Sequence, residues 1–280
     1  MTKKAELVFI PSPEMGQLLS TVELAKHLLH LDSNLSISVL IMKPPNDSKI
    51  TSYIDSLTSA TTSTTTGRLK FINLPQSFPG DIIKFMNVAN EFGVPSYVFY
   101  TSGAAFLGFK FYVQVLHDEQ NVEFHELKDS EVEFTIPTYA NPVPIKSFPP
   151  TMFNSEVVTF VVNIAKGLRE MRGIMVNTFS ELESYAWPLH ADQYMNAFLL
   201  VKDLGLAVDL KMDSESYADE VEIVKTEHIE RGIRCLMEQD SEVRKRMKEM
   251  SDESRKALVD GGSLHSSLRR FIDDVTGNLS

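Results

Sequence analysis

Two histidines and one cysteine are the residues whose types could do chemistry without a longer motif. His27 and His30 are three residues apart in a stretch with helical spacing of its apolar residues, so their rings could share a metal ion. No third ligand stands at a matching spacing, and two histidines on the solvent face of a helix are the simpler interpretation. Cys235 stands among Ile233 and Leu236 and is interpreted as a small core residue rather than an activated thiol. A single cysteine excludes an internal disulfide and a thiolate metal cluster.

The common signatures of phosphate and hydrolytic chemistry are absent from the sequence. It contains no GxGxxG or GxxxxGKS/T loop, no GxSxG turn and no HExxH helix, so none of the corresponding sites is indicated. The 280 residues carry 27 Lys and Arg against 38 Asp and Glu, a formal charge of −11. A field of that sign repels nucleic-acid phosphates, and the basic cluster at residues 244–248 is flanked by glutamates, as on a solvated helix face.

The elements that must position any site alternate between strands and helices over the first two thirds of the chain. Residues 5–10 form a short apolar run closed by prolines, residues 18–29 have helical spacing, and residues 36–42 form a second apolar run. Strand, helix and strand with short connections are the βαβ unit of a parallel sheet. Further strands are expected at residues 69–74, 94–100 and 173–178, and further helices at residues 50–57, 82–91, 101–116 and 159–171. We therefore predict most of a doubly wound α/β domain in residues 1–183.

The second part of the chain, residues 184–280, is predicted to be mostly helical. Helices are expected at residues 195–203, 225–238 and 242–258, and a last amphipathic helix follows Gly261 and Gly262 with Ser263 as its N-cap. One short strand is expected at residues 205–210, and a single strand does not form a sheet. This part therefore has the composition of an incomplete domain, in which residues 184–230 are expected to be the loosest. The proline-rich residues 136–151 are expected to lack regular structure.

No segment is long and apolar enough to direct the chain into a membrane. The first apolar run ends at Pro11, short of the roughly 7–15 residues of a signal-peptide core. The longest apolar region, residues 94–116, is interrupted by Ser96, Lys110 and glycines, whereas a spanning helix needs about 20 mostly apolar residues. We therefore expect a soluble protein of the cytoplasm.

Several stretches together resemble the plant UDP-glycosyltransferases that act on small secondary metabolites. The run LVFIPSPEMGQLLSTVELAKHLL is similar to that family's first strand, loop and helix, and VANEFGVPSYVFYTSGAAFLGF resembles its strand and helix beside the acceptor pocket. MVNTFSELES resembles the end of the family's first domain, and WPLHADQYMNAFLLVKDLGLAVDL resembles the tail of its donor-binding signature with the segment that follows. The resemblance implies a GT-B fold, in which two Rossmann-like domains face each other, the first binding the acceptor and the second mainly the nucleotide sugar.

The resemblance also implies a reaction, the inverting transfer of a sugar, taken as glucose, from a UDP-sugar to a phenolic or flavonoid hydroxyl. It implies a UDP-sugar as co-substrate, no metal or other cofactor, and a monomer. In the family a histidine in the first loop removes the hydroxyl proton and an aspartate orients it. That position holds Gln17, whose carboxamide accepts no proton near pH 7, and Gly16 before it is assigned to the acceptor pocket. The aspartate's position falls on Pro79, with Asp81 as the nearest acid.

Further family contacts carry over to positions in both parts of the chain. Asp192 and Gln193 match the acid and amide that hydrogen-bond the donor sugar, and the alternative is that they cap a helix. Thr101 matches a threonine that reaches the donor sugar in some relatives, with a helix N-cap as the alternative. Phe78 and Phe106 are assigned to the acceptor pocket, with plain core packing as the alternative.

The sequence departs from the family by internal deletions. Ser184-Tyr185-Ala186 runs directly into Trp187, whereas most of the second domain lies between those points in the family. The resemblance therefore implies an acceptor-binding domain at residues 1–183, itself shortened near residues 78–84, and a remnant of the donor-binding domain at residues 184–280. Three hypotheses stay open: a glycosyltransferase of weak or no activity, a non-catalytic protein that binds small aromatic ligands, and a truncated product without function.

Overall fold

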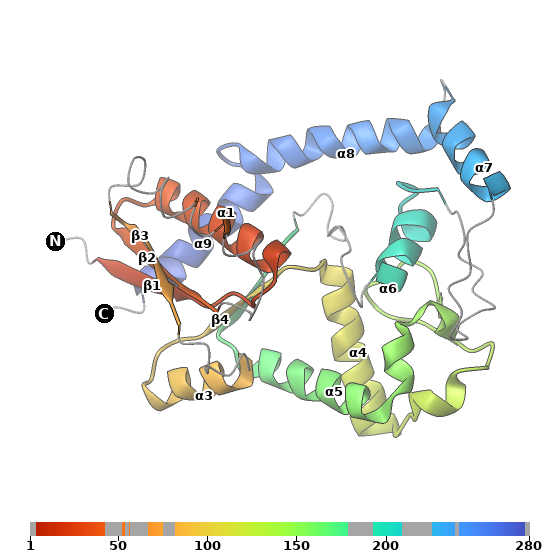
Figure 1. The fold of residues 1–280 in the computed structure, drawn as a ribbon, viewed down its shortest axis with the longest axis horizontal. Helices are drawn as coiled ribbons and strands as arrows, with labels where there is room; N and C mark the ends of the chain where they lie inside the picture. The colour runs from red at the N-terminus through yellow and green to blue at the C-terminus, as the bar shows by residue number, and fades with distance from the viewer. Residues whose placement is uncertain are drawn as a thin grey trace. The chain divides into compact units, whose positions relative to one another are not determined.

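The computed structural model describes residues 4–42, 52–53, 56, 67–74, 82–178, 193–208, 226–238 and 241–277. The chain divides into two compact units (Figure 1), a first unit of residues 1–94 with 264–280 and a second unit of residues 95–263. The predicted boundary between residues 183 and 184 lies outside the described residues, as does most of the helix predicted at residues 50–57. No helix in the described ranges is long and apolar enough to cross a membrane.

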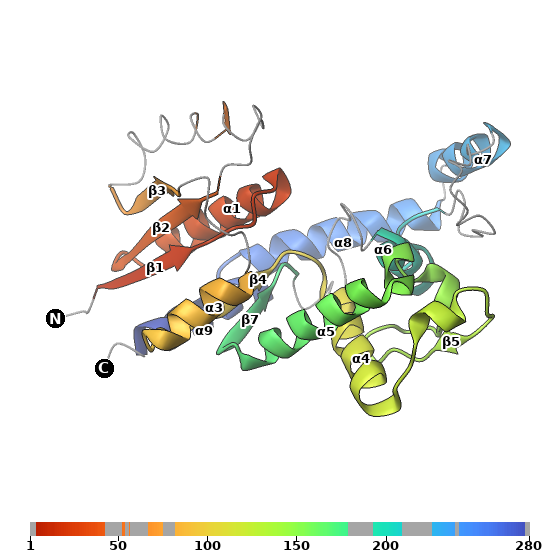
Figure 2. The same cartoon turned by 60° about the horizontal axis from the view of Figure 1, so that its bottom comes forward.

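A three-stranded parallel sheet forms the centre of the first unit. β1 (Ala5–Phe9), β2 (Leu35–Ile41) and β3 (Leu69–Asn73) pair in the order β1-β2-β3. α1 (Met15–Leu31) connects β1 to β2 and packs on β2 (Figure 2). Strand, helix and strand are present with nearly the predicted bounds, so the βαβ prediction is confirmed.

Most of the buried residues of the first unit are the apolar residues whose spacing in the sequence predicted helices and strands. α1 buries one face, which consists of Leu18, Thr21, Val22, Ala25, Leu28 and Leu29. β2, the central strand, is buried along most of its length, and α1 packs on it. α3 (Ile82–Glu91) and α9 (Ser263–Gly277) are the other helices described here, and α9 buries Leu268, Phe271 and Ile272. The predicted last amphipathic helix is therefore present, with Ser263 as its first residue.

The guanidinium group of Arg68 holds the C-terminal end of α1. It donates hydrogen bonds to the carbonyl oxygens of Leu29 at 3.0 Å, Asp32 at 2.9 Å and Leu35 at 3.2 Å. The last carbonyl groups of a helix have no partner within the helix, and a positive charge near them is favourable to the helix dipole. Because Arg68 directly precedes β3, one side chain joins the end of α1 to the starts of β2 and β3.

Replacing Arg68 with alanine is expected to lower the free energy of unfolding by about 1.5–3 kcal/mol, because hydrogen bonds that involve a charged group contribute on that scale. Arg68→Lys keeps the charge but cannot reach three carbonyl groups at once. Its stability is therefore expected to lie between that of the unchanged protein and that of Arg68→Ala. Urea unfolding followed by circular dichroism measures the difference. Lys70→Ala, at an exposed position of β3, is the matched control and is expected to change stability by less than about 0.5 kcal/mol. Equal stability of Arg68→Ala and the unchanged protein would contradict this role.

The second unit contains a second parallel strand pair. β4 (Tyr97–Tyr100) pairs with β7 (Gly173–Val176), and α4 (Ala104–Gln120) packs against α5 (Ser155–Glu170). The two predicted strands are confirmed with shorter bounds. Among the described residues, the parallel strands thus pair in two sheets, β1-β2-β3 and β4-β7, rather than in the one doubly wound sheet that the alternation suggested.

The prediction of no regular structure for residues 136–151 is wrong in part. β6 (Val143–Pro144) pairs antiparallel with β5 (Glu133–Phe134). Short 3₁₀ turns occupy η1 (Phe124–Leu127), η2 (Ile145–Ser147) and η3 (Pro150–Phe153). Proline is accepted at such places because an edge strand and the first turn of a helix leave the missing N–H group unused.

A group of phenylalanine rings, here called the aromatic cluster, forms the core of the second unit. Its members are Phe106, Phe109, Phe124, Phe134 and Phe148. The ring of Phe109 meets that of Phe148 edge to face at 4.9 Å between centroids, an arrangement that brings the positive ring edge to the negative ring face. α6 (Gln193–Phe198) adds the side chains of Met195 and Phe198 to this core, where they are 0% and 5% exposed.

The turn that follows α6 is tied to a distant loop. This turn is a π-helix, η4 (Leu199–Asp203). The carboxylate of Asp203 accepts hydrogen bonds from the backbone N–H groups of Ala140 at 3.0 Å and Asn141 at 3.2 Å. The side-chain amide of Asn141 donates a further bond at 2.6 Å. Residues 193–208, which belong to the range expected to be the loosest, are thus held by burial and hydrogen bonds, and that expectation stays a prediction. The remainder of that range is outside the described residues, except for the start of the next helix.

The strand expected at residues 205–210 is absent from residues 205–208, and residues 209–210 lie outside the described part of the chain. Gly205 has a φ of 62°, in the left-handed region that favours glycine. The N–H of Leu206 donates to the carbonyl oxygen of Leu200 at 2.9 Å. These residues therefore close the end of η4 instead of extending into a strand.

The two charged helices predicted after residue 225 are confirmed as α7 (Thr226–Met237) and α8 (Glu242–Leu258). Residues 244–248 are exposed, as expected for a solvated face. Cys235 is half-buried, while Ile233 and Leu236 beside it are 56% and 39% exposed, so its interpretation as a core residue is wrong. The sequence placed it in a core because its neighbours are apolar, and the described structure leaves those neighbours uncovered.

Candidate functional site

The residues at the expected catalytic position lie where the chain leaves β1 and enters α1, in the first unit. Pro11, Ser12 and Pro13 form the connection, and Glu14 is the extended N-cap of α1. Gly16 is exposed and Gln17 is half-buried in the first turn of the helix. Ligands of parallel α/β sheets bind outside the carboxyl ends of the strands, so Gln17 occupies the kind of place at which this architecture carries chemistry.

A small cavity adjoins this connection. Its volume is about 10 Å³ and it is lined by Pro11, Ser12, Pro13, Glu14, Leu18, Ile41 and Met42. That space suits one water molecule and no larger ligand. The side chain of Gln17 carries an amide that donates and an oxygen that accepts a hydrogen bond, but neither has useful basicity. A carboxamide at this position of the sequence could hydrogen-bond a hydroxyl group but not remove its proton.

Three of the predicted site residues lie outside the described residues, namely Asp81, Phe78 and Asp192. The backbone of Gln193 begins α6 in the second unit, and its side chain is not described. A position at the start of a helix agrees with the alternative interpretation, in which Asp192 and Gln193 cap a helix. Their contact with a donor sugar stays a prediction.

Thr101 lies at the carboxyl end of β4, next to a residue that the sequence reasoning missed. Asn177 follows β7, and its backbone N–H donates to the carbonyl oxygen of Tyr100 at 2.8 Å. Its side-chain amide donates to the carbonyl oxygen of Thr101 at 3.5 Å. The N-cap of α4 is Gly103, so the helix-cap alternative for Thr101 is wrong. The sequence signal for Asn177 is weak, a single polar residue directly after an apolar run that predicts a parallel strand.

Phe106 is packed into the aromatic cluster. It is 7% exposed, and its ring stacks on that of Phe109 with 5.5 Å between centroids and 20° between planes. The ammonium group of Lys110 lies 5.2 Å from the centroid of Phe106 and 5.1 Å from that of Tyr100, within the range of cation–π attraction. The core-packing alternative therefore describes Phe106, and Lys110, one helical turn further along α4, is a charged group that sequence reasoning missed.

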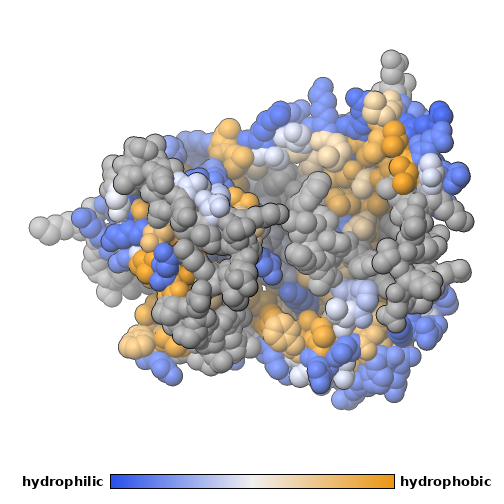
Figure 3. Space-filling model, viewed as in Figure 1, coloured by the Kyte–Doolittle hydropathy of each residue, from blue (hydrophilic) through white to orange (hydrophobic). Residues whose placement is uncertain are grey.

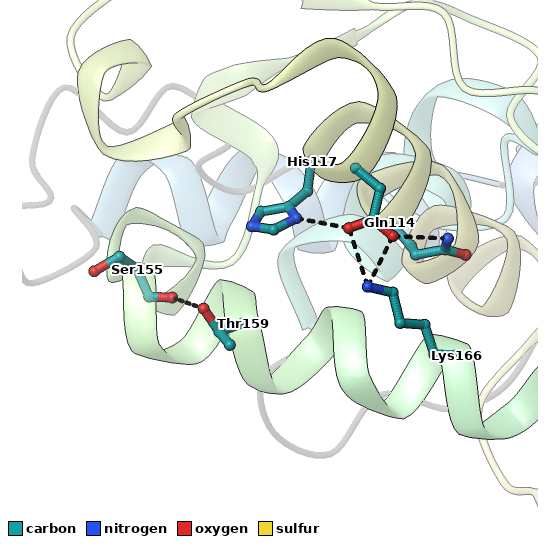
Figure 4. A network of polar contacts seen from close by, with 6 residues as sticks. Gln114, His117, Ser155, Thr159 and Lys166 are labelled. Atoms are coloured by element: carbon teal, nitrogen blue, oxygen red, sulfur yellow. Dashed lines mark hydrogen bonds and ion pairs between the residues drawn. The ribbon is translucent and has the colours of Figure 1, made fainter.

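A network of polar side chains joins α4 to α5 within the second unit (Figure 4). Its centre is Asp118, whose carboxylate lies 3.0 Å from His117 Nδ1 and 3.0 Å from Lys166 Nζ and accepts a hydrogen bond from Gln114 at 3.1 Å. These contacts, that of His117 first, lower the pKa of Asp118 to about 2. The carboxylate therefore stays charged throughout the physiological range and serves to fasten two helices rather than to transfer protons.

The lowered pKa of Asp118 predicts a pH-dependent stability. The unfolded carboxyl titrates near 3.9, so the stabilisation is fully present above that pH and is lost as pH falls toward about 2. The difference in unfolding free energy between the unchanged protein and Asp118→Asn is expected to shrink as pH falls from about 4 toward 2. Chemical unfolding followed by circular dichroism at each pH measures this difference. Glu119→Gln removes the next carboxylate on α4 and is the control; a difference that does not shrink in acid would contradict the assignment.

The described residues hold no group of three or more His, Cys, Asp or Glu side chains that could bind a metal ion. His27 and His30 are exposed on α1, as the simpler interpretation held.

The chain is similar to plant glucosyltransferases along most of its length. It is 29% identical to UDP-glucose flavonoid 3-O-glucosyltransferase 6 of Fragaria ananassa over 481 aligned positions, which cover 98% of this chain and 99% of that protein. It is 30% identical to anthocyanidin 3-O-glucosyltransferase 6 of Manihot esculenta, covering 70% of this chain and 89% of that protein. Because this chain has 280 residues, a large part of the Fragaria protein has no counterpart in it. No family model matches the chain.

Solved structures of plant proteins have the same fold. The crystal structure of a UGT transferase from Siraitia grosvenorii in complex with UDP superposes with a TM-score of 0.82, at 26% identity, over 97% of this chain and 100% of that chain. UGT71G1 of Medicago truncatula, complexed with UDP-glucose, has a TM-score of 0.81 at 22% identity over 99% of both chains, which shows a shared fold.

Proposed function

This chain belongs to the plant UDP-glycosyltransferases, and we propose that their reaction, the transfer of glucose from UDP-glucose to a phenolic or flavonoid hydroxyl, runs weakly or not at all in this copy. Its fold is a truncated GT-B fold, which supplies the scaffold for such a transfer. The observation that carries the proposal is the position of Gln17, in the first turn of α1 at the carboxyl end of β1.

The transfer needs a base at this place. The acceptor oxygen attacks the anomeric carbon, the bond from that carbon to the UDP oxygen breaks with inversion, and the hydroxyl proton passes to a protein group. The carboxamide of Gln17 can hydrogen-bond the hydroxyl group, but it does not take up the proton. Loss of a general base lowers the rate by roughly 10²–10⁴.

The donor side of the proposal rests on the missing length. The alignment with the Fragaria protein spans 481 positions against 280 residues here, and the sequence passes directly from Ala186 to Trp187. The segment that follows Gln193 is held by the aromatic cluster, in which Met195 is fully buried. We infer that this remnant now serves packing, and that binding of a UDP-sugar is weak or lost. We also propose that the protein resides in the cytoplasm and that no metal or other cofactor takes part.

UDP-glucose is expected not to raise the melting temperature of the protein at concentrations that saturate an intact relative. A ligand that binds the folded state stabilises it by mass action, by about 2.7 kcal/mol at one hundred times its Kd. Differential scanning calorimetry of the two proteins side by side measures the effect, with UDP alone as a second ligand. A concentration-dependent rise in this protein would show a working donor site and refute that part of the proposal.

The variant Gln17→His separates the missing base from the missing donor site. Turnover of a flavonol with UDP-glucose, followed by chromatography of the glucoside, is expected to be at least about 10²-fold below that of an intact relative. Gln17→His restores a base, yet its turnover is expected to stay low because the donor is not held; Gln17→Ala is the control and is expected to match the unchanged protein. A rise of about 10²-fold in Gln17→His would mean that the base was the single defect.

Binding of small aromatic ligands without catalysis is the competing function. Phe106, its assigned pocket residue, is packed in the core, which gives that function less support. Saturable heat on calorimetric titration with a phenol, without turnover, would favour it.

A further inference from the structure

Glu14 places a carboxylate at the edge of the sheet where the transfer needs a base. It is the N-cap residue of α1, and Gln17 stands three residues later in the first turn of that helix. Side chains at the N-cap and at the third helical position are close enough to reach the same backbone groups, as the capping box shows. The carboxylate of Glu14 is therefore within side-chain reach of the space beside Gln17.

The helix does not use this carboxylate. The side chain of Glu14 makes no capping hydrogen bond with α1, and within the described part of the chain no ion pair holds it. Glu14 is exposed, and it lines the small cavity of this connection together with Ile41 and Met42 at the end of β2. Its carboxylate can thus accept a proton from a bound hydroxyl group without giving up a contact that the fold needs.

No other side chain described at this edge of the sheet could take up the proton. The described residues that directly follow β1, β2 and β3 are residues 10–14, 42 and 74. Glu14 is the one acid or base among them. The nearest histidine of α1, His27, is ten residues beyond Gln17, about 15 Å along the helix. Because ligands of parallel α/β sheets bind outside the carboxyl ends of the strands, Glu14 is placed for the reaction and His27 is not.

We propose that Glu14 is the general base of the slow glucosyl transfer of this chain, an inference that rests on the proposed function. The acceptor oxygen forms its bond to the anomeric carbon, and the bond from that carbon to the UDP oxygen breaks with its electron pair. The hydroxyl proton passes to a carboxylate oxygen of Glu14, as glutamate bases do in other enzymes, and then to bulk water. Gln17 takes no part in the proton transfer, in agreement with the unchanged turnover expected of Gln17→Ala.

Substitution of Glu14 in the full chain tests the proposal, with the flavonol glucoside measured by mass spectrometry. Glu14→Gln keeps the size of the side chain and removes the base, so the initial rate is expected to fall by about 10²-fold or to the rate in buffer. Glu23→Gln is the matched control on the same helix and is expected to leave the rate unchanged, because the Glu23 carboxylate pairs with Lys26 at 2.7 Å and lies nine residues beyond Glu14. Equal rates for Glu14→Gln and the unchanged protein overturn the proposal.

Rescue by a small carboxylate separates a base from a structural role. Glu14→Ala leaves room for formate, which is expected to raise the rate of this variant by at least about tenfold in proportion to its concentration. Formate is expected to leave the rate of the unchanged protein and of Glu23→Gln as it is. A merely structural defect would not respond to formate, so a Glu14→Ala variant that formate does not activate also overturns the proposal.

A second donor separates the failure of this inference from the failure of the proposed function. α-Glucosyl fluoride carries its own leaving group, and its transfer asks nothing of a uridine site. No transfer by the unchanged protein from either donor overturns the role of Glu14 and leaves the proposed loss of activity standing. Turnover of UDP-glucose equal to that of an intact relative refutes the proposed function, and the rate of Glu14→Gln then decides on the base by itself.

Discussion

Burial of Met195 and Phe198 in the core of the second unit is the interaction that holds α6 and the segment after it. An apolar helix face that loses its original cover must find another, because exposure of that surface to water is unfavourable. Met195 and Phe198 meet this requirement inside the unit, and Asp203 fixes the end of the segment to the loop at Ala140. α7 comes from the same part of the chain and does not meet it, as the exposure of Ile233 shows. The two helices therefore differ in one respect: α6 buries its apolar side chains, whereas α7 leaves several of its own exposed (Figure 3).

The sequence predicted those helices and strands whose apolar residues are regularly spaced within the element itself. β1, α1, β2, α5 and α9 occur close to the expected positions, because each has a regular buried face. α8 also occurs at its expected position, although it buries only Ala257. Residues 205–208 were predicted wrongly because a short apolar run resembles a strand, while Gly205 in the left-handed region ends a helix there. Cys235 was placed in a core because local apolarity does not reveal whether a covering element exists. Pairing of strands across long distances, which separates β1-β2-β3 from β4-β7, is likewise not written in local sequence.

The candidate site was predicted in outline and less well in its contacts. The motif around Gly16 and Gln17 located the carboxyl end of β1, because the strand and the helix that flank it are regular. Asn177 was missed because a single polar residue after a strand carries little signal until its partner, the carbonyl group of Thr101, is known. Gln17 serves as a residue of α1 as well as histidine would, so the fold does not depend on whether a base stands at this position.

The π-helical turn η4 makes the chain length between α6 and the loop at Asn141 consequential. A π-turn accommodates one residue more than an α-helical turn, and successive α-helical residues are rotated by about 100°. Deleting one residue from this turn would yield a more regular helix, yet it would swing the carboxylate of Asp203 away from the amides it binds. The π-helical geometry thus points the carboxylate of Asp203 toward the loop. A shorter segment with a regular α-helix would bind that loop less well.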